Sequence, residues 1–148
     1  MQTPAQQLAG FIGKFNPEVA RLIRTSRRAL RVRLPTAIEI VYDNYNALAI
    51  GFGSTERASD AIVSLAAYAR GVNLYFIHGA RLKDPDALLR GKGTQGRFIP
   101  LGSAKDIERP DVRALLGAAC RLGKVPLPAT GRGRLVIKSI SAKQRPRR

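Results

Sequence analysis

Hydrophobic side chains recur at three- and four-residue intervals in two stretches near the N-terminus, and this period predicts helices packed on a core. The first stretch, residues 4–15, carries Leu8, Phe11, Ile12 and Phe15. The second begins at Asn16-Pro17-Glu18, where a capping residue, a proline at the first helical position and an acid in the first turn predict a helix to about residue 31. Its predicted inward face consists of Val19, Leu22, Ile23, Ser26 and Leu30.

After Pro35 the pattern changes to alternation, which predicts strands. Residues 36–42 place Ile38, Ile40 and Tyr42 on one side, and residues 47–52 do the same for Leu48, Ile50 and Phe52. The polar residues 43–46 between them predict a turn and an antiparallel hairpin. Residues 61–69 fit either a strand or a helix by period, and we expect a strand because Arg70-Gly71 is followed by a clear strand over 72–78. A last strand is predicted over 97–101.

Two further helices are predicted in the second half of the chain. Asp84 as a cap and Pro85 at the first position predict a short helix that ends at Gly91. Pro110-Asp111 opens a helix that runs to Gly123, and Ser103 or Asp106 could open another before it. The order of two helices, a run of strands and then further helices therefore predicts an α+β fold.

Residues 1–123 are predicted to form one α+β domain, in keeping with a length of 148 residues. Residues 124–148 differ in composition, since prolines and glycines are concentrated in residues 124–133. We interpret that part as a linker, followed by a possible edge strand over 135–140 and a basic tail over 141–148 that is expected to be mobile.

The charge of the chain is unusual. Lysine and arginine number 26 against 10 aspartates and glutamates, which gives a formal net charge of +16 and a pI near 11.3. Such a surplus favours an anionic partner, either nucleic acid or another polyanion. The basic residues fall into three clusters, at 21–33, 81–97 and 121–148.

One predicted helix carries a regular row of cations. Arg21, Arg24, Arg28 and Arg31 recur at three- and four-residue steps, so they are expected to form one exposed stripe with Arg27 beside it. Phosphates held along such a stripe would give affinity without sequence specificity. The stripe is our first candidate for anion binding, and a solvated surface without a partner is the alternative.

A second candidate lies between residues 72 and 99. Residues 91–96, GKGTQG, satisfy G-x-G-x-x-G, but a dinucleotide site needs a strand before and a helix after the loop, which is the reverse of the predicted order. The glycines are therefore expected to provide backbone dihedral angles that other residues rarely adopt. The loop amides, together with Lys92 and Arg97, remain a candidate small-anion site. His78, the only histidine, is a candidate pocket residue, with Tyr42, Asp43 and Tyr75 as spatial partners.

The sequence contains no G-x-S-x-G, H-E-x-x-H, C-x-x-C or paired-carboxylate arrangement, so we name no catalytic residue, metal ligand or cofactor. Cys120 is the only cysteine and lies within an apolar helical pattern, where a buried thiol is expected. No segment approaches the roughly 20 apolar residues of a membrane span. We therefore expect a cytoplasmic binding protein that is not an enzyme.

Two stretches resemble the YdhG-like domain, a bacterial family of unknown function. They are YDNYNALAIGFG (42–53) and VNLYFIHGARLKDPDALLRGKGTQGRFIPL (72–101). The most specific part is the pattern L-x-D-P-x-x-L-L-x-G-x-G, matched by Leu82, Asp84, Pro85, Leu88, Leu89, Gly91 and Gly93 and followed by Arg97 on the next strand. The resemblance implies a curved, mainly antiparallel sheet packed against N- and C-terminal helices, and no established enzyme activity.

One member of that family has been described as a frataxin-like iron chaperone, so the resemblance also implies iron binding as an alternative function. Hard iron sites favour clustered carboxylates. In this chain Glu39, Asp43, Glu56 and Asp60 are scattered around the predicted hairpin. Three hypotheses therefore remain. They are a polyanion-binding module, an iron carrier whose binding would depend on Asp43 and His78, and a pocket for a small anion or metabolite near the glycine loop, lined by His78, Lys92 and Arg97.

Overall fold

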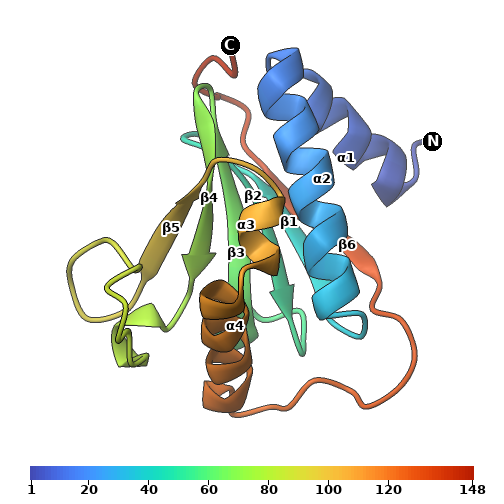
Figure 1. The fold of residues 1–148 in the computed structure, drawn as a ribbon. Coiled ribbons are helices and arrows are strands. Elements are labelled where there is room, and N and C mark those ends of the chain that lie inside the picture. Colours follow the sequence, from blue (N-terminus) through green and yellow to red (C-terminus); the bar gives the residue numbers. More distant parts are fainter.

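Six strands form one mixed sheet in the computed structural model, which describes residues 1–148 (Figure 1). The strands are β1 (Ile38–Asp43), β2 (Leu48–Gly53), β3 (Ala61–Tyr68), β4 (Gly71–Phe76), β5 (Arg97–Leu101) and β6 (Leu135–Ile140). Their order across the sheet is β5-β4-β3-β2-β1-β6. Strands β1 to β5 pair antiparallel with their neighbours, and β6 pairs parallel with β1.

The α-helices lie on one face of this sheet (Figure 1). They are α1 (Pro4–Gly13), α2 (Pro17–Arg33), α3 (Lys105–Glu108) and α4 (Pro110–Leu122), and two short 3-10 helices, η1 (Ala58–Asp60) and η2 (Gly79–Arg81), follow β2 and β4. Thr3 and Gln6 form a capping box at the start of α1, and prolines begin α1, α2 and α4. The predicted α+β class is confirmed.

The core lies between the helices and the sheet. Alternate strand residues point toward the helices, among them Val41, Ile50, Leu65 and Leu74, and all four are at most 1% exposed. Ile23 of α2 packs against this layer. Burial of one such aliphatic side chain stabilises the fold by about 1.5–3 kcal/mol. The other side chains of each strand, which include Tyr42 and Tyr75, point to the opposite face of the sheet.

The short helix predicted from Asp84 to Gly91 is wrong, because this segment is a loop. Asp84 does act as a cap, since its carboxylate accepts hydrogen bonds from the amides of Leu88 (2.9 Å) and Leu89 (2.7 Å). Ala87, however, has a φ of 53°, which ends any helical turn. Arg90 then pairs with Phe98 as an isolated bridge beside β5.

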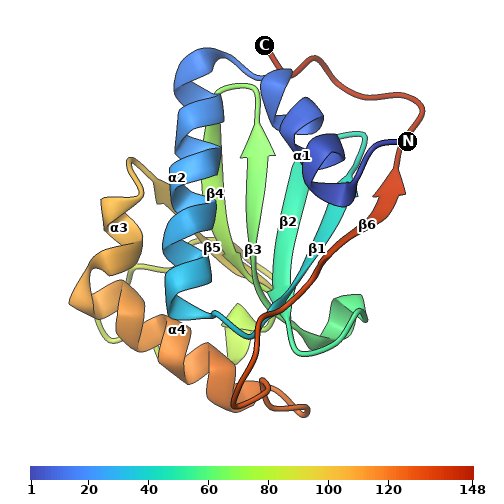
Figure 2. The same ribbon diagram turned by 90° about the vertical axis from the view of Figure 1, so that its right-hand side faces the viewer.

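Residues after α4 return to the sheet as a strand. The segment from Lys124 to Gly133 runs from the end of α4 to β6 (Figure 2). Gly133 lies against the backbone of Ala37, where a Cβ would sit 1.6 Å from the Ala37 carbonyl oxygen. Strand β6 then occupies the edge of the sheet beside β1.

The sequence predicts a mobile tail over residues 141–148, whereas the structure docks this segment across the end of β1. The Ser141 amide donates to the Asp43 carbonyl (2.9 Å), and the Arg145 amide donates to the Tyr45 carbonyl (2.8 Å). Arg147 is only 5% exposed and donates to the Asp43 carboxylate at 3.0 Å. No helix is both long and apolar enough to cross a membrane.

Candidate functional site

The arginine stripe, which we define as Arg21, Arg24, Arg28 and Arg31, is exposed along α2. The side chains of Arg21, Arg24 and Arg28 make no ion pair with an acidic residue. Arg31 differs, because its Nε lies 3.4 Å from Glu39. Three of the four stripe residues are therefore open to an external anion.

Arg27, beside the stripe, has a structural role. Its guanidinium donates to both carboxylate oxygens of Glu39, from Nε at 2.6 Å and from Nη2 at 3.1 Å. Glu39 is 5% exposed and points from β1 toward α2. This bidentate pair neutralises a buried charge and fixes α2 on the sheet. Sequence reasoning missed it because Glu39 occupies an ordinary strand position.

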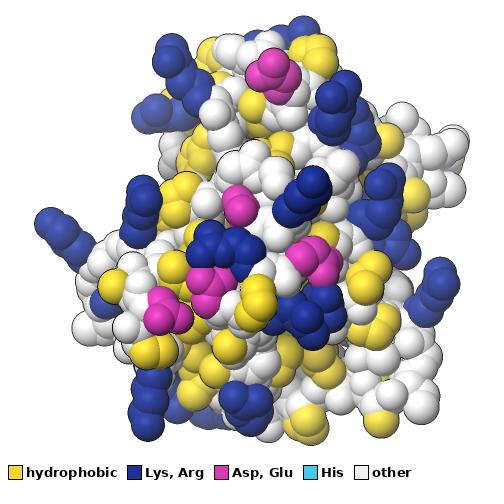
Figure 3. Space-filling view, in the orientation of Figure 1, with side chains coloured by type: hydrophobic (Ala, Val, Ile, Leu, Met, Phe, Trp, Pro, Cys, Tyr) yellow, Lys and Arg dark blue, Asp and Glu magenta, His cyan; other side chains and the backbone are white.

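The fold uses few of its cations in ion pairs. Seven of the 26 lysines and arginines lie within 4.0 Å of a carboxylate, which leaves nineteen without an acidic partner. Figure 3 shows lysine and arginine side chains distributed over the helical face, with a few acids between them. On this face the positive charge is spread widely rather than gathered into one patch.

The glycine loop, residues 91–96, is stabilised by hydrogen bonds from the residue that follows it, Arg97. The Arg97 guanidinium donates to the carbonyl oxygens of Gly96 (2.7 Å) and Gly93 (3.0 Å). Gly91 and Gly93 have φ values of 117° and 93°, which favour glycine. Arg97 thus closes the loop with its own hydrogen-bond donors, while Lys92 is exposed.

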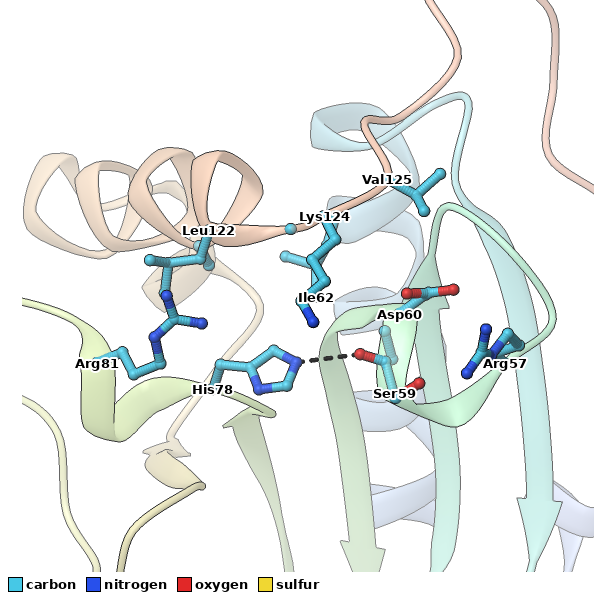
Figure 4. A pocket seen from close by; sticks show the side chains of 12 residues that line it. Arg57, Ser59, Asp60, Ile62, His78, Arg81, Leu122, Lys124 and Val125 are labelled. Carbon is cyan, nitrogen blue, oxygen red and sulfur yellow. Dashed lines mark hydrogen bonds between the residues drawn. The ribbon is translucent and has the colours of Figure 1, made fainter.

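His78 lies in a different place, a cavity of about 320 Å³ that neither Lys92 nor Arg97 lines. It follows β4, and its Nε2 lies 3.0 Å from the Ser59 carbonyl oxygen, so Nε2 carries the proton in this contact. Figure 4 shows Arg81, Lys124 and Arg57 around this hydrogen bond.

The His78 cavity is formed by elements far apart in the sequence. Arg81 ends η2, Lys124 follows α4, and Arg57 precedes η1. None of these three cations is paired with a carboxylate. Asp60, the one acid in the lining, accepts a 2.6 Å hydrogen bond from Thr55. The cavity therefore carries an excess of positive charge suited to a small anion.

Tyr42 and Tyr75 come together in a second, larger hollow on the sheet face opposite the helices. We call it the tyrosine concavity, with a volume of about 630 Å³, and its lining includes Tyr45 and Tyr68 as well. No residue of an α-helix lines it. The sequence signal that could have found it is the alternation, which places Tyr42 and Tyr75 opposite the core-facing residues of β1 and β4.

The floor of the tyrosine concavity is made of small side chains. Across the sheet, Ile40 pairs with Gly51, Gly51 with Ser64, and Ser64 with Tyr75. The next row runs from Tyr42 through Ala49 and Ala66 to Asn73. Small residues on the two central strands and larger ones on the flanking strands leave a hollow that crosses the sheet.

The glycine loop contributes one contact to this hollow. A Cβ on Gly96 would lie 1.7 Å from the Tyr75 hydroxyl oxygen, so only glycine leaves room for that ring tip. The loop thus supports the position of Tyr75, a role the sequence pattern did not indicate.

Asp43 does not line the tyrosine concavity. Its side chain is 1% exposed and is directed toward the helical side, where Arg147 (3.0 Å) and Lys14 (3.6 Å) approach its carboxylate. The Arg147 guanidinium also lies 5.7 Å from the centre of the Phe15 ring. Asp43 therefore anchors the C-terminal tail.

No group of three or more histidine, cysteine, aspartate or glutamate side chains is placed to hold a metal ion. His78 follows the end of β4 that lies level, across β3 and β2, with Glu39 near the start of β1. Asp43 is the last residue of β1, so it lies at the other end of the sheet. These two residues, on which the iron hypothesis depends, are not brought together.

Four groups outside these cavities have shifted pKa values, and one of them is Arg109, whose pKa is raised by its hydrogen bond to Asp111. The hydrogen bond and charge of Arg134 lower the pKa of Glu56, and the hydrogen bond from Arg109 lowers that of Asp111. Burial raises the pKa of the Cys120 thiol, and the charge of Arg121 opposes this shift. The Cys120 thiol is therefore protonated at neutral pH and is a poor nucleophile.

Comparison with protein-family models, with curated proteins and with solved structures finds no match to this chain.

Proposed function

We propose that this chain is a non-catalytic binding module for a polyanion, with nucleic acid as the partner. The observation that carries the proposal is the unbalanced charge of the folded protein, in which nineteen of 26 lysines and arginines have no carboxylate within 4.0 Å. Phosphates can replace the counterions that surround such cations, and the released ions drive binding. A cytoplasmic location goes with this function, because nucleic acid is found there.

The arginine stripe supports the proposal because it is unfavourable for the free protein. Arg24 lies three residues after Arg21 and four before Arg28, and neither neighbour is neutralised. Each such like-charge contact destabilises a helix by about 0.2–0.5 kcal/mol. A bound phosphate backbone would turn this repulsion into attraction.

The test is charge reversal on the stripe. The double variant Arg24→Glu and Arg28→Glu is expected to bind duplex DNA more weakly at low salt, with a salt slope smaller by about 0.9 for each phosphate that the protein no longer neutralises. The matched control is Lys105→Glu with Arg113→Glu, which makes the same charge change at exposed, unpaired positions on α3 and α4. Equal weakening by both variants would refute the stripe as the contact surface. No binding of the wild type to either duplex or single-stranded DNA at low salt would refute the function.

We also propose that the chain is a YdhG-like domain with the corresponding sheet and helix sandwich. The L-x-D-P-x-x-L-L-x-G-x-G motif and the order of helices and strands along the chain support this assignment. The iron-carrier alternative has less support, because Asp43 is engaged by Arg147 and lies far along the sheet from His78.

A small anion in the His78 cavity is a second candidate function, favoured by the three unpaired cations that line it. His78 is the only histidine, so its ring protons give a unique NMR signal. Inorganic phosphate is expected to shift this signal with saturation, and Arg81→Ser with Lys124→Ser to abolish the shift. Lys105→Ser, outside the cavity, is the control. A signal that does not move with phosphate would contradict this candidate.

A further inference from the structure

All four tyrosines of the chain line the tyrosine concavity. Two of them are substantially exposed in a folded protein, Tyr45 at 48% and Tyr68 at 44%. They come from separate places, Tyr42 from β1, Tyr45 from the following turn, Tyr68 from β3 and Tyr75 from β4. The fold therefore gathers all the tyrosine rings of the chain on the face that no α-helix covers.

The chemistry of the concavity suits flat, uncharged ring systems. Its lining contains no charged side chain, and its floor of Ala49, Gly51, Ser64 and Ala66 lies low between the tyrosines. Strands β1 and β4, which carry Tyr42 and Tyr75, are three strand spacings apart, roughly 14 Å across the sheet. This width leaves room for planar groups to reach the tyrosine rings.

Cations flank the concavity at both ends. Arg57 precedes the lining residue Ala58 at one end, while Arg70 follows Tyr68 at the other, and both are exposed without a carboxylate partner. The tail adds Arg145, whose guanidinium lies 5.6 Å from the centre of the Tyr45 ring. Uncharged aromatic walls between exposed cations match a ligand that carries bases and phosphates along one chain.

We propose that the tyrosine concavity binds single-stranded nucleic acid, with bases stacked on the tyrosines and phosphates held by the flanking arginines. This inference rests on the proposed function, and it adds the strand state and a base-contacting surface on the sheet face opposite the arginine stripe. In a duplex the base faces are covered by their neighbours, so only an unpaired strand can offer them to the tyrosine rings. The preference is for exposed bases rather than for a particular sequence.

The chain provides its own reporter for this site. It contains no tryptophan, so its tyrosine fluorescence is not masked, and all of that tyrosine fluorescence comes from residues of the concavity. An oligothymidylate is titrated into the full chain at low salt, with an abasic oligonucleotide of equal length, a duplex and thymidine monophosphate as comparisons. Stacking is expected to quench the fluorescence with the oligothymidylate alone, and to make its binding roughly 5- to 100-fold tighter than that of the abasic strand.

Two variants separate stacking from charge. Tyr68→Ala is expected to remove most of the preference for the oligothymidylate while leaving affinity for the abasic strand unchanged, and Tyr68→Phe, which keeps the ring, is the matched control. Ala66→Phe fills the floor without deleting a tyrosine and is expected to have the same effect as Tyr68→Ala.

Equal affinity for the abasic strand and the oligothymidylate would overturn the inference but leave polyanion binding intact. Binding of thymidine monophosphate as tightly as the oligothymidylate would also overturn it, in favour of a small-molecule pocket. No binding of any oligonucleotide would refute the proposed function as well.

Discussion

Arg147 offers the sharpest test of the structure, because it is the one buried cation of the chain and it neutralises a buried carboxylate. The guanidinium donates to Asp43 at 3.0 Å and to the Asn44 carbonyl at 2.6 Å. Replacing Arg147 with methionine keeps an apolar stem against Phe15 but leaves the Asp43 carboxylate with only half-exposed Lys14, 3.6 Å away. We therefore expect a large loss of stability from one residue next to the C-terminus.

Breaking a buried pair by removing one partner costs about 3–5 kcal/mol. The residual help from Lys14 places this case near the lower end, so we expect the free energy of unfolding to fall by about 3 kcal/mol. For a chain of this size the melting temperature then falls by roughly 6–12 °C. Urea unfolding followed by far-ultraviolet circular dichroism measures the change.

Lys143→Met is the matched control, since it removes the same charge from an exposed position in the same tail. It is expected to change stability by less than about 0.5 kcal/mol. The double variant Asp43→Asn with Arg147→Met is expected to lose less unfolding free energy than the two single variants lose in total, because it leaves no buried charge unpaired. If Arg147→Met proves as stable as Lys143→Met, the docked tail is refuted.

Three further predictions follow from single contacts. Gly133→Ala places a Cβ 1.6 Å from the Ala37 carbonyl oxygen and is expected to lower the free energy of unfolding by about 1–3 kcal/mol. Gly10→Ala, whose Cβ would meet nothing within 4 Å, is expected to raise it by about 0.5–1 kcal/mol. Melting temperatures of the two variants that shift in the same direction would contradict this. Because burial raises the pKa of the Cys120 thiol, its alkylation by iodoacetamide at neutral pH is expected to be slower in the native protein than in urea. The native rate is expected to increase as the pH rises through that raised pKa. Equal rates in the native protein and in urea would contradict this prediction. Arg24→Glu is expected to raise the melting temperature slightly, since repulsion along α2 becomes attraction, and a fall would contradict the repulsion argument.

Local signals in the sequence were sufficient for most of the fold. The proline starts at Pro17 and Pro110 and the alternation in β1 and β2 act within a few residues, so they do not depend on the rest of the chain. The start signal at Asp84 failed for the opposite reason. The following residues take a left-handed turn at Ala87 and are drawn into a bridge with β5, which is a tertiary contact.

The contacts that define the sites were less accessible from the sequence. Arg147 and Asp43 are separated by 104 positions, and nothing near either residue indicates the other. Glu39 resembles an ordinary strand residue until α2 is placed above it. The prediction paired His78 with Lys92 and Arg97 by proximity in sequence, whereas the bend after β4 directs His78 toward Ser59.

The tyrosine concavity is an intermediate case. Alternation alone places Tyr42 and Tyr75 on the sides of their strands opposite Val41 and Leu74. It does not say that both sides belong to one face, because that depends on the register of all the strands between them. The register also brings the small residues of β2 and β3 to the centre, which is what makes the face concave.

We propose that this protein binds a nucleic-acid backbone through its unpaired cations. The most direct measurement is the dissociation constant of a fluorescently labelled oligonucleotide over a series of salt concentrations. We expect a linear plot of log K against log salt concentration with a steep negative slope, about 0.7 for each phosphate bound on a single strand and about 0.9 on duplex DNA. A slope near zero, or no binding at the lowest salt concentration, would contradict the claim.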